Sequence, residues 1–144
     1  MNLAMPNSQT LLGFDFGMKR IGVAVGQTVT GTATALLTLQ AKNGAPNWDE
    51  VEALIKEWHP NALVAGIPVN LDGTPQHMTK AAQRFAEALE KRFGLPVYRV
   101  DERLTTKEAR QRLFDAGGYR ALQKSQIDSF AACLILESWL HQHL

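Results

Sequence analysis

Three strand-like segments follow one another near the start of the chain, and the connections between them restrict how they can be arranged. Residues 10–17, 21–28 and 32–39 each have the alternating or β-branched composition that is typical of strands. Only a few residues separate each segment from the next. A parallel pair of strands needs a long crossover connection, so these segments are predicted to pair as antiparallel neighbours.

The hydrophobic period then changes from that of strands to that of helices. Asn47 is a suitable cap for a helix whose apolar residues recur at helical spacing as far as Trp58. Residues 62–67 form a short, wholly apolar run that is typical of a strand buried on both faces. Thr74, followed by Pro75, predicts the start of a long helix. Further elements are expected at residues 97–100 (a strand), 105–114 and 125–141 (both helices).

This order of elements predicts an α/β fold. Antiparallel strands followed by βαβ crossovers favour a mixed five-stranded sheet with helices on its faces. The expected strand order is 3-2-1-4-5, with the second strand antiparallel to its neighbours. The length of 144 residues fits one domain, which we expect to span residues 1–144.

Charge and cysteine content restrict the class of protein. The net charge is +1, which is low for a nucleic-acid-binding protein, although residues 99–124 carry seven basic and four acidic side chains. The one cysteine, Cys133, lies in an apolar run and is expected to be buried and inert. The first ten residues lack a signal pattern, and no apolar stretch is long enough to span a bilayer, so a cytoplasmic protein is expected.

Acidic residues occupy positions where an ionised carboxylate is costly. Asp15 lies in mid-strand between two phenylalanines, and Glu102 follows the last predicted strand at its carboxyl end. Asp128 lies near the start of the final helix. Each also has a structural explanation. Asp15 could pair with Lys19 or Arg20 and Glu102 with a neighbouring arginine, while Asp128 could cap the helix that begins at residue 125.

The predicted sheet order favours a functional role for these acids over the structural ones. It places the first strand beside the fourth, so that Asp15, Glu102 and Asp128 can converge at one edge. Clustered carboxylates repel one another unless cations neutralise them, and oxygen ligands favour Mg²⁺ or Mn²⁺. A pair of such ions would support phosphodiester hydrolysis.

Four sequence motifs resemble those of the YqgF/RuvX family. They are DFGMKRIGVA at residues 15–24, GIP with DGT at residues 66–74, DERLTT at residues 101–106 and DSxAA at residues 128–132. They occur in family order, and the resemblance extends from about residue 11 to residue 140. It implies a ribonuclease-H-like fold, in agreement with the predicted order of elements.

The resemblance also implies a function and its site. It implies a nuclease of ribosome biogenesis that matures the 5′ end of pre-16S rRNA, with Asp15, Glu102 and Asp128 as catalytic, metal-binding residues. By the same resemblance, basic residues would contact nucleic acid, namely Lys19, Arg20, Arg103 and Lys124. Expected partners are pre-rRNA or branched DNA and ribosomal precursor particles, with a monomer or weak homodimer as the active form.

Other functions fit parts of the same pattern. A Holliday junction resolvase is one alternative, and it would have to be a two-fold dimer to make two symmetric cuts. A non-catalytic RNA-binding module is another, although retention of all three acids disfavours it. An ATPase of the actin type shares the opening Asp-x-Gly turn, but such proteins bind nucleotide between two domains.

Overall fold

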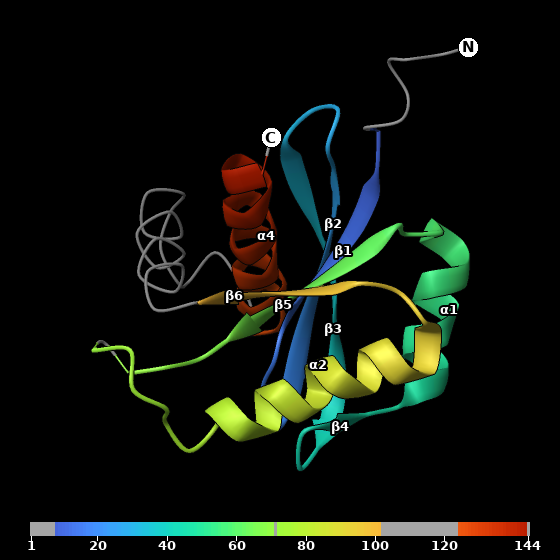
Figure 1. The fold of residues 1–144 in the computed structure, drawn as a ribbon. Coiled ribbons are helices and arrows are strands. Elements are labelled where there is room, and N and C mark those ends of the chain that lie inside the picture. Colours follow the sequence, from blue (N-terminus) through green and yellow to red (C-terminus); the bar gives the residue numbers. More distant parts are fainter. Residues whose placement is uncertain (1–7, 71, 102–123, 144) are drawn as a thin grey trace.

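A computed structural model describes residues 8–70, 72–101 and 124–143 of the chain (Figure 1). Strands β1 (Thr10–Asp15), β2 (Arg20–Gln27) and β3 (Thr32–Lys42) form successive antiparallel pairs, as predicted. The turn between β1 and β2 is tight, because a Cβ at Gly17 would overlap the carbonyl oxygen of Arg20. This turn therefore needs glycine.

Two parallel strands extend the sheet from β1. Strand β5 (Ala62–Ile67) pairs with β1, and β6 (Val97–Asp101) pairs with β5. The full order is β4-β3-β2-β1-β5-β6, so the five long strands are ordered as predicted. Strand β4 (Ala45–Pro46) was not predicted and makes the sheet six-stranded. It arises because Asn43 and Gly44 have φ angles of 52° and 82° and reverse the chain, as an Asn-Gly hairpin turn requires.

Helix α1 (Trp48–Trp58) begins where the sequence predicts. The side chain of Asn47 accepts a hydrogen bond of 3.0 Å from the backbone N–H of Asp49, which satisfies one of the free donors at the helix start. The helix ends at His59, which has a left-handed conformation and is followed by Pro60.

Helix α2 (Thr79–Phe93) begins later than the sequence predicts, and the assignment of Thr74 as its cap is wrong. The carboxylate of Asp72 accepts hydrogen bonds from both the backbone N–H and the hydroxyl of Thr74. Thr74 is therefore held in a turn, and competition of this kind between side chains and backbone is what keeps such residues out of helices. The helix instead starts after Met78, which makes no side-chain cap.

One hydrophobic core lies between the sheet and helices α1 and α2 (Figure 1). Phe85 of α2 is at its centre. Its ring lies 5.7 Å from that of Phe14, 5.4 Å from that of Phe16 and 5.8 Å from that of Trp48, measured between centroids. Ala82, Ala86 and Leu89 of the same helix are buried in this core as well.

Helix α4 (Lys124–His143) covers the opposite face of the sheet, where it packs mainly over β1, β2 and β3 (Figure 1). Small residues let it approach closely: a Cβ at Gly13 or Gly26 would come within 3 Å of the Leu136 side chain. Cys133 is buried in this second core, as expected. No helix among the described residues is long and apolar enough to cross a membrane. The helix predicted over residues 105–114 lies outside the described residues.

Candidate active site

Asp15 is the last residue of β1, and its side chain lies on the sheet face that α4 covers. Residues two apart in a strand share a face, and Gly13 faces Leu136 of α4. Asp15 also pairs across the sheet with Gly22 of β2, whose missing side chain faces the carbonyl of Asp128. Asp15 is half-buried there, so its carboxylate lies at the edge of the second core rather than within it.

Asp128 is brought to this edge by direct contact between α4 and β2. A Cβ at Gly22 would overlap the carbonyl of Asp128 and come within 2.8 Å of the Ser129 nitrogen. The backbone of α4 therefore lies directly on Gly22, next to the strand position of Asp15. The structure thus brings Asp15 and Asp128, two of the three predicted acids, to one end of β1 and one face of the sheet.

The carboxylate of Asp128 is held by an ion pair with Arg20. The Arg20 Nε donates to Asp128 Oδ2 at 2.8 Å, and the two side chains are 37% and 24% exposed. Asp128 was predicted in the first turn of the last helix, but the helix begins at Lys124 and its first turn contains no acidic residue. Asp128 is therefore too far along the helix for the capping role that the sequence left open.

The donor set at this edge fits a hard divalent ion. Asp15 and Asp128 contribute carboxylate oxygens, the ligands that Mg²⁺ and Mn²⁺ prefer. The third predicted acid, Glu102, lies outside the described residues. Within residues 8–70, 72–101 and 124–143, no three acidic, histidine or cysteine side chains are grouped closely enough to hold a metal ion.

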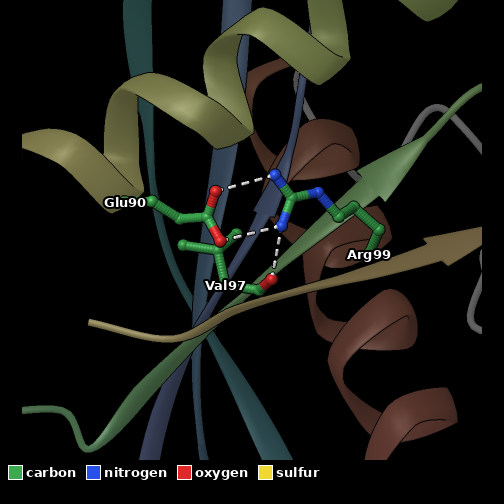
Figure 2. Close-up of polar contacts among 3 residues, drawn as sticks. All are labelled: Glu90, Val97 and Arg99. Atoms are coloured by element: carbon green, nitrogen blue, oxygen red, sulfur yellow. Dashed lines mark hydrogen bonds and ion pairs between the residues drawn. The ribbon is translucent and has the colours of Figure 1, made fainter. Parts of the chain in front are cut away.

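Asp101, the neighbour of Glu102, belongs to the other face of the sheet. Arg99, two residues earlier in β6, bonds to Glu90 of α2 (Figure 2). Asp101 shares that face and lines a pocket of about 500 Å³ with Gln83 and Glu87 of α2. The sheet therefore separates Asp101 from Asp15 and Asp128, a distinction that the sequence could draw only from the family resemblance.

The bond between Arg99 and Glu90 joins β6 to α2 and predicts a small pH effect. Arg99 donates to both oxygens of Glu90, at 3.1 Å and 2.9 Å, and to the carbonyl of Val97 at 2.7 Å (Figure 2). This hydrogen bonding lowers the pKa of Glu90 and raises that of Arg99. Because the pKa of Glu90 is lowered on folding, the pair stabilises the fold above the unfolded pKa. That contribution is lost as the pH falls through the folded pKa.

We expect Glu90→Gln to lower the urea midpoint slightly at neutral pH, since the pair is partly exposed. The difference from the unsubstituted protein should vanish as acid protonates Glu90. Midpoints measured between about pH 3 and pH 7 would test this. In an Arg99→Gln background the same substitution should give no pH-dependent difference; if it does, the pair is not its cause.

Of the predicted nucleic-acid-binding residues, the structure describes the side chains of Lys19 and Arg20. Lys19 is exposed in the turn between β1 and β2, and its backbone carbonyl accepts a hydrogen bond of 2.8 Å from the N–H of Ala41 in β3. Arg20 starts β2 and is already paired with Asp128. Lys124 begins α4, but its side chain is outside the described residues, as is Arg103.

A family model described as "RuvX: Holliday junction resolvase" matches residues 9–142 of the chain. Curated relatives are similar over almost their full length. A protein of Shewanella oneidensis is 53% identical over 137 residues, covering 95% of this chain and 97% of the relative. A protein of Mannheimia succiniciproducens is 56% identical over 132 residues, covering 92% and 94%. Both are named "Putative pre-16S rRNA nuclease".

Solved structures with the same fold are more distant in sequence. The chain matches Thermus thermophilus RuvC in complex with a Holliday junction substrate with a TM-score of 0.54 and 16% identity, covering 93% of this chain and 94% of that one. The yeast mitochondrial Holliday junction resolvase Ydc2 matches with a TM-score of 0.55 and 12% identity, covering 93% and 78%. These matches confirm the ribonuclease-H-like fold class.

Proposed function

The chain belongs to the RuvX family, and from that premise we propose that it is a metal-dependent nuclease whose catalytic acids are Asp15, Glu102 and Asp128. The observation that carries the proposal is the position of two of these acids. Asp15 and Asp128 come from a strand and a helix that are 113 residues apart in number, yet both lie on the α4 face at the end of β1. A structural role for either acid alone would not require the other beside it.

The residues at this edge would have different roles in phosphodiester hydrolysis. Asp15, Glu102 and Asp128 would together hold two divalent ions, either Mg²⁺ or Mn²⁺. Such ions, when bound, activate a water molecule and neutralise charge on the phosphate. Arg20 fixes the Asp128 carboxylate from one side, which limits the orientations that this ligand can adopt.

We further propose that the substrate is RNA at the 5′ end of pre-16S rRNA. Relatives that are 53–56% identical over nearly their whole length carry that name. The resolvases of known structure share only 12–16% identity, which supports a common fold and says little about substrate. The junction-resolvase alternative rests on the family description.

One assay compares the two substrates directly. The purified protein would be incubated with labelled RNA carrying a 5′ leader and with a four-way DNA junction, each in Mg²⁺ and in Mn²⁺. We expect the RNA to be cut in a metal-dependent manner. Cleavage confined to the junction would replace the proposed substrate, and cleavage of neither under any metal would contradict the enzyme assignment.

Basic side chains around the acids would bind the substrate. Lys19, Arg103 and Lys124 would contact phosphates near the acids, whereas Arg20 would act first on Asp128. The protein would work in the cytoplasm as one domain over residues 1–144, on ribosomal precursor particles, as a monomer or weak homodimer. A lone buried thiol is compatible with that reducing compartment.

A further inference from the structure

Tyr98 is an aromatic side chain that remains 41% exposed although it stacks on another ring. Its ring lies 4.8 Å from that of Trp139 at an interplanar angle of 25°. Trp139 stacks in turn on His143 at 4.3 Å and 14°. Trp139 is only 9% exposed, so Tyr98 rests on a ring that the core of α4 holds in place. We call these three residues the aromatic stack.

The aromatic stack lies on the same face of the sheet as the catalytic acids. Tyr98 aligns across β5 and β1 with Gly13, two residues before Asp15. With strands about 4.8 Å apart and a rise of about 3.3 Å per residue, the Cα atoms of Tyr98 and Asp15 are separated by about 12 Å. Helix α4 covers mainly β1, β2 and β3, which leaves Tyr98 of β6 at the margin of that cover. A substrate chain at the acids would need only a few nucleotides to reach Tyr98.

The chemistry of an exposed, supported ring fits one kind of ligand. Nucleobases stack on aromatic side chains with little preference for sequence, and a ring that is already ordered loses little freedom when a base adds to it. Bases within a duplex are stacked on one another, so only an unpaired base can use such a ring. The phenol also gives the ring a polar edge that tolerates water.

We propose that the aromatic stack is a binding site for an unpaired nucleobase of the substrate, with Tyr98 as the contacting ring. The substrate strand is then single-stranded a few nucleotides from the bond that is cut. This inference rests on the proposed nuclease function, but it concerns binding and can be tested without cleavage. It also favours a single-stranded RNA leader over the paired arms of a junction.

The test measures binding of the full chain to fluorescently labelled oligonucleotides in EDTA, where no cleavage occurs. The probes are a uridine decamer, a thymidine decamer and a duplex of the same length. Tyr98→Leu keeps an apolar cover on Trp139 but removes the ring, and should weaken binding of both single strands by about tenfold to a hundredfold. Tyr98→Phe keeps the ring and should bind within about twofold of the unsubstituted protein. If only the RNA decamer responds, the site would also read the sugar.

Leu37→Ala provides a matched control, because Leu37 is similarly exposed, at 39%, but on the strand β3. It should leave binding unchanged. Unchanged single-strand binding by Tyr98→Leu would overturn the proposal, as would an equal loss for the duplex or an equal loss in Tyr98→Phe. Cleavage assays on the same variants separate the two hypotheses. A protein that binds through Tyr98 yet cuts nothing would refute the nuclease and leave the stacking site standing.

Discussion

Asp15→Asn is expected to lower metal-dependent cleavage by about a thousandfold while leaving the protein folded. A carboxylate that binds divalent ions contributes several kcal/mol to the transition state, and each 1.4 kcal/mol corresponds to about tenfold in rate. The amide retains the shape of the side chain but loses its charge. Asp15 lies half-buried at the end of β1, so an isosteric change there should disturb packing little. Single-turnover cleavage in Mg²⁺ and Mn²⁺, with circular dichroism on the same samples, would measure both effects.

Asp101→Asn provides the control for this prediction. Both aspartates end a strand of the sheet, β1 or β6, but Asp101 lies on the α2 face and Asp15 on the α4 face. The same chemical change on the wrong face should alter the rate by no more than a few fold. If Asp15→Asn and Asp101→Asn reduced the cleavage rate equally, negative charge near the strand ends, rather than a specific metal ligand, would support cleavage. An Asp15→Asn protein as active as the unsubstituted one would remove Asp15 from the site.

The strand portion of the fold was predictable because alternation in a strand leaves a direct record in the sequence. Leu12 and Phe14 alternate with Gly13 and Asp15 along the chain, and the two faces of β1 divide in that way between the two cores. Short connections then dictated antiparallel pairing. Within the described part of the chain, the one strand that the sequence does not predict is Ala45–Pro46. It follows an Asn-Gly pair, which is a hairpin signal in its own right.

The start of α2 was not predictable from capping patterns. Thr74 and Thr79 are both hydroxyl residues near the helix, and a sequence cannot say which hydrogen bonds each will make. Thr74 is held by Asp72 in the preceding turn, while the hydroxyl of Thr79 donates to the carbonyl of Pro68. Thr74 therefore does not cap the helix as predicted, because a contact within the preceding turn uses its hydroxyl.

The convergence of the acids depended on a feature that sequence reasoning overlooked. Asp15 was identified from its place between two phenylalanines, but nothing in the neighbourhood of Asp128 locates it near β1. The signal lies instead in β2, where Gly22, Ala24 and Gly26 alternate on the face opposite the large apolar residues. Small side chains at every second position indicate that another element approaches the sheet closely. In this chain that element is α4.

This close approach makes Gly22→Ala the most informative structural variant. The backbone of Gly22 does not have positive φ, so space is the main obstacle to a side chain. An added Cβ would overlap the carbonyl of Asp128, a backbone group that cannot rotate away. The second turn of α4 must shift, which we expect to cost about 1–3 kcal/mol of unfolding free energy. Displacement of Asp128 by about 1 Å should reduce cleavage by about a hundredfold.

Gly26→Ala is the control that separates a loss of unfolding free energy from a displacement of Asp128. Gly26 lies on the same strand and face, but its added Cβ would meet the side chains of Leu136 and Leu140, further along α4. Flexible side chains can yield where backbone cannot, so Gly26→Ala should lose less stability and retain cleavage within a few fold. Urea unfolding would measure the stability of both variants, and single-turnover assays would measure their cleavage rates. If Gly22→Ala and Gly26→Ala cleaved at equal rates, the contact between Gly22 and Asp128 would not position the carboxylate. Both glycines would then serve only to let α4 pack closely on the sheet.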